Sequence, residues 1–309
     1  MGLTRNVLLW ASESPYLLRH VPNVRFVRKA LKRFMPGEDL EDAIDAAKGF
    51  QIDRIPTVFT YLGESVSNLE EARLVRDHYL SLLEKISREK LDIEVSVKLT
   101  QLGLDLDTGE AYENFIALAE KGRRLNNVIW IDMERSNYVD STIDLYRKVK
   151  KDYPNTGICL QSYLRRTKND LNALLEISPM IRLVKGAYNE PKEIAYPEKR
   201  IVDANYFELA TVLLKGIKEN GVRAAFGTHD TKLQAQIIAA AEEVGISKEN
   251  VEIQMLYGIK PNEQIRLANE GYGIRVLISY GKAWYKWYVR RLAERPANIG
   301  FVLKNIFTS

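Results

Sequence analysis

Cysteine is nearly missing from this sequence. The single cysteine, Cys159, cannot form a disulfide within the chain, and one unpaired thiol is typical of a protein in a reducing compartment. Histidine is also scarce, because His20, His78 and His229 are the only three, and their spacing is not that of metal ligands. We therefore predict a cytoplasmic protein that folds without disulfides and holds no metal.

Long hydrophobic runs are absent as well. No stretch approaches the roughly 20 apolar residues that a membrane-spanning helix needs. A short apolar piece at 7–11 lacks the length and the cleavage site of a secretory signal. The net charge of +4 is too small to indicate nucleic-acid binding, although it suits contact with an anionic membrane surface. The sequence also lacks GxGxxG, Walker and GxSxG motifs, so any nucleotide cofactor must be held in another way.

What the sequence does contain is a regular alternation of short β-rich runs and helical patterns after Pro56. Eight such runs predict parallel βα units closed into an α/β (β/α)8 barrel. The expected strands are Thr57–Leu62, Ile93–Leu99, Val128–Met133, Gly157–Ser162, Ile181–Gly186, Ala224–Thr228, Val251–Leu256 and Ile274–Ser279. The helices expected between them include Glu70–Arg88, Tyr112–Arg124, Ser141–Lys150, Val202–Glu219, Lys232–Val244 and Pro261–Asn269.

Helical patterns also precede the predicted barrel. Apolar residues from Leu17 to Leu31 follow a helical period among many basic residues, and Glu38–Lys48 is predicted to be a second helix. We therefore divide the chain into an N-terminal helical extension, 1–50, and a catalytic barrel domain, 51–309. The basic first helix is a candidate for peripheral contact with the inner face of the cell membrane.

A helix is expected near the C-terminus, between a turn at Gly281 and a stop at Pro296. Tryptophan and tyrosine recur in it at helical spacing, so it has a broad aromatic face that must pack on other parts of the protein. Arg290 and Arg291 lie where this face meets the polar side. They are either a solvated basic edge or a clamp for one small anion.

Polar residues gather at the predicted carboxyl ends of the strands, where barrel enzymes hold their chemistry. Lys98 and Asp132 end neighbouring strands, so we expect an ion pair, which is either structural or a charged wall of a substrate pocket. Arg182 lies within a strand and needs a partner or a ligand. His229 is either a hydrogen-bonded structural residue or a cofactor contact, and Glu64 is either an exposed acid or a gate that pairs with the late helix.

Eight short motifs, taken together, resemble those of the monofunctional bacterial proline dehydrogenases. They follow one another in that family's order from the first strand to near the C-terminus. The motifs are YLGE (61–64), VSVKLTQLG (95–103), IDME (131–134), LQSYL (160–164), RLVKGAY (182–188), THD (228–230), MLYG (255–258) and YGKAWYKWYVRRLAERPAN (280–298).

The resemblance implies a distorted TIM barrel whose last helix caps the active site. It also implies a flavoprotein that uses FAD to oxidise L-proline to 1-pyrroline-5-carboxylate, passes electrons to a quinone and supplies a pyrroline-5-carboxylate dehydrogenase. Asp132 and Arg182 would be the catalytic residues, with Arg182 near the hydride-accepting flavin nitrogen. The substrate contacts would be Lys98, Arg290, Arg291, Leu256, Leu277 and Glu64. The FAD contacts would be Met133, Gln161, Val184, Lys185, Gly186, Ala187, Tyr188, Thr228 and His229.

The sequence departs from the family pattern just before the last helix. Leu277 and Ser279 stand where the family usually has a tyrosine and a proline, and that tyrosine packs against the substrate ring. A related hydroxyproline-type dehydrogenase is therefore an alternative. Two further alternatives are an aldolase with a Schiff base on Lys98 or Lys185, and a barrel that only binds a small amino or imino acid.

Overall fold

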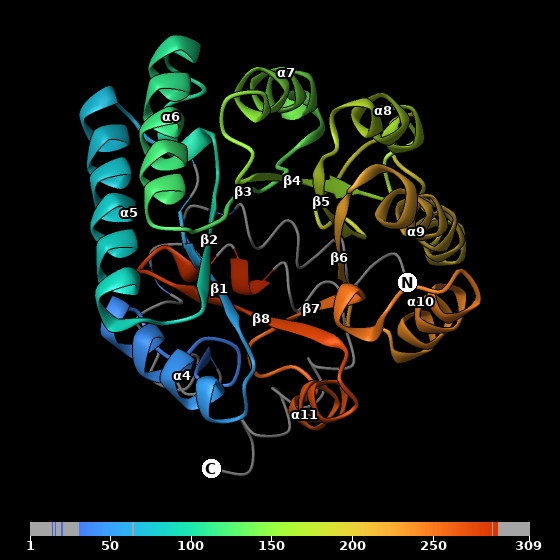
Figure 1. Cartoon of the computed structure of the whole chain (residues 1–309). Helices are drawn as coiled ribbons and strands as arrows, with labels where there is room; N and C mark the ends of the chain where they lie inside the picture. Colours follow the sequence, from blue (N-terminus) through green and yellow to red (C-terminus); the bar gives the residue numbers. More distant parts are fainter. Residues whose placement is uncertain are drawn as a thin grey trace.

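Eight parallel strands form one closed barrel in the order of the sequence (Figure 1). The computed structural model describes residues 31–63, 65–285 and 287–289, together with Ser14, Tyr16 and His20. The strands are β1 Thr57–Tyr61, β2 Ile93–Val97, β3 Ile129–Ile131, β4 Thr156–Gln161, β5 Met180–Val184, β6 Arg223–Gly227, β7 Glu252–Leu256 and β8 Gly273–Tyr280. Because β8 pairs with β1 in parallel, the sheet has no free edge.

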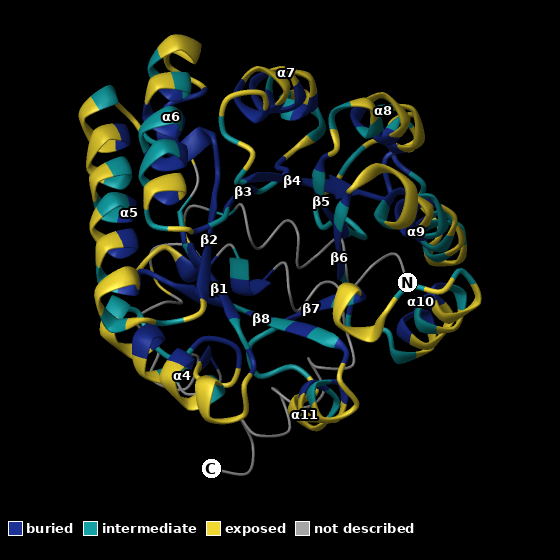
Figure 2. Cartoon of the chain, viewed as in Figure 1, coloured by how far each residue is buried: buried dark blue, intermediate teal, exposed yellow. Residues whose placement is uncertain are grey.

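Helices surround the barrel and cover its outer face (Figure 1). They are α4 Leu40–Ile52, α5 Leu69–Glu89, α6 Thr108–Arg124, α7 Val139–Lys150, α8 Thr167–Leu174, α9 Lys199–Asn220, α10 Thr231–Glu243 and α11 Pro261–Asn269. Figure 2 shows that each ring helix turns a buried face to the sheet and an exposed face outward. In α5, for example, Tyr79, Leu82 and Ile86 are buried, while the helix begins with the exposed acids Glu70 and Glu71.

Side-chain caps fix where several of these helices begin. Asn68 accepts a hydrogen bond from the backbone of Glu71 at the start of α5, and Asp107 does the same for Glu110 in α6. Asp230 caps α10 in the same way, at the mouth of the barrel. Each cap satisfies a backbone N–H that has no partner within its own helix. The loops after the strands are therefore held in place where a site can be built.

The strands alternate between two environments. One set of side chains packs in a large core between the sheet and the helices. The other set points into the barrel, where Val58, Trp130 and Ala225 form a small apolar cluster. Below that cluster, at the amino ends of the strands, lie the paired charges of Glu94 and Arg223. Because both faces of the sheet are covered, the strands contain few of the exposed polar residues found in one-sided sheets.

The predicted barrel is confirmed, with strand ends that differ from expectation by a few residues. Lys98 and Asp132 come directly after their strands, and α11 has the predicted limits. The predicted domain boundary between 50 and 51 falls inside α4, which packs against β1 and β8 and contributes Ala43, Ile44 and Ala47 to the main core. The division into two parts therefore stays a prediction.

Residues near the two ends of the chain pack together at the carboxyl ends of the strands. Phe34 and Met35 share a buried cluster with Leu62, which follows β1, and with Trp284 and Tyr288. The Trp284 indole also donates a hydrogen bond to Glu38 Oε1, over 2.9 Å. Residues 284–285 and 287–289 are helical, as predicted for this stretch, and they pack beside Leu62 next to β1. That this helix caps the active site stays a prediction.

Two glycines make this close packing feasible. Gly281 has a φ of +113°, and a Cβ there would lie 2.9 Å from the ring of Tyr61. Gly258 has a φ of +71°, and a Cβ there would lie 1.6 Å from the carbonyl oxygen of Arg33. Glycine adopts these conformations without strain and leaves room for the neighbouring chain. The turn predicted at Gly281 is thus confirmed.

Candidate active site

A buried group of ionic side chains lies just inside the mouth of the barrel. Asp132 follows β3 and lies between two cations: its Oδ2 is 3.4 Å from Lys98 Nζ, and its Oδ1 is 3.1 Å from Arg182 Nη1. The side chains of Lys98 and Arg182 are 9% and 3% exposed. Two buried cations share one carboxylate, so the group as a whole favours an anion. The predicted Lys98–Asp132 pair is confirmed.

Two hydroxyl groups extend this cluster. Ser96 Oγ donates to Asp132 Oδ1 over 2.7 Å and accepts from Arg182 Nη1 over 2.9 Å. Lys98 Nζ donates to Thr60 Oγ1 over 3.4 Å. Neither Ser96 nor Thr60 was predicted from the sequence. Both point into the barrel from a buried strand, and alternation along β1 and β2 was the signal that could have found them.

The backbone turns sharply at Gly186, two residues after β5 ends. Its φ is +103°, and a Cβ there would lie 2.1 Å from the ring of Tyr163. Any other residue at this position would be strained and would also clash, so glycine is required on two grounds. Ala187 and Tyr188 follow and are half-buried. The contact with Tyr163 explains the glycine, and the small-residue wall for a flat ligand expected along this stretch stays a prediction.

Lys185 lies in a four-charge group that joins β5 to the starts of α9 and α10. Its Nζ lies 2.5 Å from Asp203 Oδ1 and 3.3 Å from Asp230 Oδ2, and Lys199 pairs with the same two carboxylates. Burial raises the pKa of Asp230, but Lys185, the backbone N–H of Leu233 and Lys199 together more than offset this and hold the pKa below its ordinary value. The Lys185 amine is thus held between two carboxylates and does not lie free to attack the carbonyl of a substrate, as a Schiff-base lysine must.

His229 uses one ring nitrogen inside the protein. Its Nε2 accepts a hydrogen bond from the backbone N–H of Leu256 over 2.9 Å, which places the proton of a neutral ring on Nδ1. Thr228 is buried, and its carbonyl accepts from Gln234. The structural role that the sequence allowed for His229 is therefore present, and it orients Leu256, which was predicted to contact the substrate.

Three of the predicted cofactor residues lie at neighbouring strand ends. Gln161 Nε2 donates to the carbonyl of Met133 over 3.3 Å, and within the described part of the chain Gln161 Oε1 is buried without a hydrogen-bond partner. Val184 is half-buried at the end of β5 and lies opposite Gly227 of β6. Gly227 carries no side chain there, and a Cβ would lie 2.8 Å from Val184.

The opposite wall of the mouth is apolar. Leu256 of β7 and Leu277 of β8 are register partners and are both half-buried. Ser279 lies two residues further along β8 and is buried, and its Oγ has no hydrogen-bond partner among the described residues. Glu64, Arg290 and Arg291 lie outside the described residues, so their predicted roles stay predictions.

Neither a metal site nor a membrane span is found in the part of the chain that the structure describes. No group of three or more histidine, cysteine or acidic residues could hold a metal ion there. Within the same residues, no helix combines the length and the apolar character that crossing a bilayer requires. Taken together, the mouth of the barrel offers two buried cations on one side and two leucines on the other. This arrangement suits a small ligand with a carboxylate at one end and hydrocarbon at the other.

Comparison with known proteins agrees with this interpretation of the site. The profile of the family described as "Proline dehydrogenase" matches residues 43–304. The chain is 35% identical over 304 residues to "Proline dehydrogenase 2" of Bacillus subtilis strain 168, covering 98% of this chain and 99% of that protein. It is 35% identical over 280 residues to "Proline dehydrogenase" of Deinococcus radiodurans, covering 89% of each.

Solved structures show the same fold. The crystal structure of proline utilization A from Bdellovibrio bacteriovorus, inactivated by N-propargylglycine, superposes with a TM-score of 0.80 and 25% identity. The match covers 93% of this chain but only 36% of that protein. The chain therefore spans about a third of the length of that protein. The comparison shows a shared barrel, and no other property of that protein is assigned to this chain.

Proposed function

The chain belongs to the proline dehydrogenase family and oxidises proline in proline catabolism, and from this premise we propose how its barrel does so. The proposed reaction converts L-proline to 1-pyrroline-5-carboxylate with FAD bound at the mouth and a quinone as the electron acceptor. A pyrroline-5-carboxylate dehydrogenase is the proposed next enzyme. The proposed location is the cytoplasm, with peripheral contact to the inner face of the membrane through the basic N-terminal segment.

The residues at the mouth fit a flavin. Arg182 Nε and Nη2 are buried and have no hydrogen-bond partner in the described part of the chain, and the same holds for Gln161 Oε1. Buried donors and acceptors of this kind are rare in proteins unless a ligand or water satisfies them. Gly186 has no side chain and the next residue, Ala187, carries only a methyl group, so this stretch offers little steric obstacle to a flat ring. FAD supplies the electron acceptor for the C–N oxidation when it is bound.

Lys98 is the proposed anchor for the carboxylate of proline, together with Arg290 and Arg291. Charge-assisted hydrogen bonds from an ammonium and two guanidiniums would fix the orientation of a small ring. Asp132 keeps Lys98 in place, and its negative charge offsets the repulsion between the buried cations Lys98 and Arg182. Leu256 and Leu277 form the apolar wall for the ring carbons. A ring held in one orientation has less entropy to lose at the transition state.

The observation that carries this proposal is the shared carboxylate of Asp132, which joins Lys98 to Arg182 in one buried cluster. Ion pairing disfavours the aldolase alternative, because Lys98 pairs with Asp132 and Lys185 pairs with Asp203 in a separate group. Leu277 in place of the usual tyrosine keeps a hydroxyproline-type substrate as the second candidate.

An anaerobic titration tests the proposal. The purified protein is expected to be yellow, to lose its flavin colour on addition of L-proline, and to respond less to trans-4-hydroxy-L-proline. A stronger response to hydroxyproline would select the second candidate. A colourless protein that cannot be reconstituted with FAD, or a protein trapped by borohydride in the presence of substrate, would overturn the proposal.

A further inference from the structure

We propose that Ser96 and Trp130 are positioning residues that hold the guanidinium of Arg182 in place beneath the reaction site. This inference rests on the proposed function, because Arg182 is the residue placed next to the cofactor. Neither Ser96 nor Trp130 is needed to bind substrate in the mechanism above. Their contacts show how a buried arginine with few hydrogen bonds is kept in one orientation.

Ser96 fixes one end of the guanidinium. Its hydroxyl donates to Asp132 Oδ1 over 2.7 Å, and the same oxygen accepts from Arg182 Nη1 over 2.9 Å. Arg182 Nη1 also lies 3.1 Å from Asp132 Oδ1, so the three groups form a closed triangle. Only a small hydroxyl side chain can donate and accept at once in this space. Ser96 is fully buried, so water does not replace it.

Trp130 supports the flat face of the same group. The Arg182 Cζ lies 4.6 Å from the centre of the Trp130 ring, and both side chains are buried. A cation over an indole face is attracted by the ring quadrupole, and most strongly where water is excluded. Gly157 of β4 makes room for the indole, since a Cβ there would lie 2.4 Å from it. The indole is therefore confined as well as stacked.

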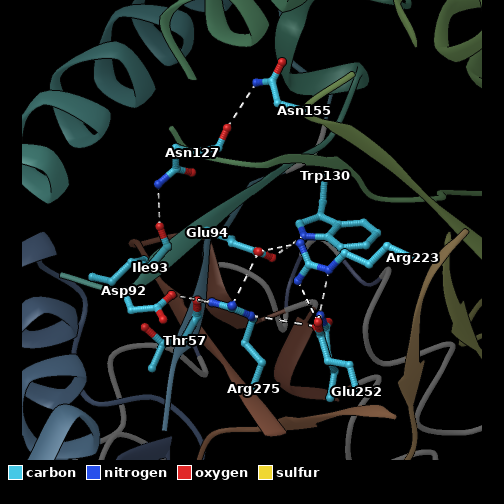
Figure 3. A network of polar contacts seen from close by, with 11 residues as sticks. Thr57, Asp92, Ile93, Glu94, Asn127, Trp130, Asn155, Arg223, Glu252 and Arg275 are labelled. Atoms are coloured by element: carbon cyan, nitrogen blue, oxygen red, sulfur yellow. Dashed lines mark hydrogen bonds and ion pairs between the residues drawn. The ribbon is translucent and has the colours of Figure 1, made fainter. Parts of the chain in front are cut away.

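The indole is itself anchored at its ring nitrogen, as Figure 3 shows. Its Nε1 donates to Glu94 Oε2 over 2.7 Å, and the other oxygen of Glu94 accepts from Arg223 Nη1 over 2.7 Å. Arg275 Nη2 also lies 3.5 Å from Glu94 Oε1. Burial raises the pKa of Glu94, but Arg275 and Arg223 more than offset this and keep the pKa below its ordinary value. An ionised carboxylate therefore fixes the indole, and the indole supports the arginine.

These supports matter because Arg182 has little else to hold it. Its Nε and Nη2 have no hydrogen-bond partner among the described residues, and its ion pair uses Nη1 alone. Without the triangle and the stack, the guanidinium can rotate away from the mouth. Its positive charge then does less to favour the reduced, more negative form of a nearby flavin. The redox potential of bound FAD is therefore a direct readout of how well Arg182 is placed.

The test compares four variants as FAD-loaded proteins. Ser96→Ala opens the triangle, Ser96→Thr keeps the hydroxyl, and Trp130→Leu removes the stack at a smaller but still apolar volume. Tyr206→Phe is the matched control, because Tyr206 donates to the carbonyl of Leu183, next to Arg182 on the outer side of β5. It loosens the same strand without touching Arg182. For each, the midpoint potential of FAD and the FAD dissociation constant are measured.

Ser96→Ala and Trp130→Leu are expected to make the midpoint potential of FAD more negative by about 30 mV or more. For a two-electron couple, a shift of about 30 mV is a tenfold decrease in the equilibrium constant for reduction of the flavin. Ser96→Thr and Tyr206→Phe are expected to stay within a few millivolts of the wild type. The inference would be overturned if all variants had the midpoint potential of the wild type. It would also be overturned if Tyr206→Phe shifted the potential as much as Ser96→Ala does. A wild type that binds no FAD would instead overturn the proposed function. If Trp130→Leu does not fold, the two Ser96 variants still decide.

Discussion

Removal of the Asp132 carboxylate should destabilise the protein far more than removal of an exposed acid. In Asp132→Ala, the ammonium of Lys98 and the guanidinium of Arg182 both lose their only carboxylate partner among the described residues. Their side chains are 9% and 3% exposed, so water cannot fully replace it. Breaking a buried pair by removing one partner destabilises proteins by about 3–5 kcal/mol. We expect a loss in this range.

A surface pair provides the control. Lys168 Nζ lies only 2.5 Å from Glu208 Oε1, but the two side chains are 54% and 51% exposed. Exposed pairs contribute about 0–1 kcal/mol whatever their distance, because water solvates both charges. Glu208→Ala should therefore change the free energy of unfolding by about 1 kcal/mol or less. Burial, rather than the length of the contact, decides the difference between the two variants.

Urea denaturation without substrate measures both effects. The double variant Lys98→Met/Asp132→Ala should be more stable than Asp132→Ala alone, because it removes one of the two stranded cations. If Asp132→Ala loses no more stability than Glu208→Ala, the two cations do not depend on Asp132 and the reasoning is wrong. A double variant that is less stable than the single one would also contradict this expectation.

Three further predictions follow from the structure. Gly186→Ala should weaken FAD binding and lower the free energy of unfolding by several kcal/mol, because the new Cβ meets the ring of Tyr163. Gly221→Ala, with a φ of +65° and open space, should lower it only by the roughly 1–2 kcal/mol that a left-handed backbone costs, and equal losses in urea would refute the clash with Tyr163. Burial lowers the pKa of Lys150 from 10.5 to about 8, so the unfolded chain binds more protons than the folded one between these pH values. The free energy of unfolding should therefore rise by about 2–3 kcal/mol as the pH increases through this range, and Lys150→Met should lack this rise. The rate of flavin reduction by proline should increase with pH, because the amine must be neutral when it is oxidised; a flat profile from mildly acidic to alkaline pH would contradict this.

Much of the barrel could be predicted because its signals are local. Each strand is a short β-rich run, and α11 begins at a proline and was predicted at its observed limits. Lys98 and Asp132 could be paired in advance because consecutive βα units place consecutive strands side by side. Strand ends were less certain, since residues such as Leu99 and Met133 continue the apolar pattern after the strand has ended.

The supports beneath the site could not be predicted in the same way. Glu94 and Arg223 are 129 residues apart, and only barrel closure brings them together. Trp130 looks like an ordinary core residue in the sequence, and its stack on Arg182 depends on the absence of a side chain at Gly157. The left-handed turn at Gly186 was anticipated only as a small-residue patch. These features depend on contacts between side chains that lie far apart in the sequence, and the hydrophobic periodicity of the sequence does not predict such contacts.

The proposed role of Lys98 is to hold the carboxylate of proline at the mouth of the barrel. Anaerobic stopped-flow reduction of the wild type and of Lys98→Met, over a range of L-proline concentrations, tests it most directly. A charged hydrogen bond contributes about 1.5–3 kcal/mol, so the concentration for half-maximal rate should rise at least about tenfold in the variant. An unchanged half-maximal concentration would contradict the account.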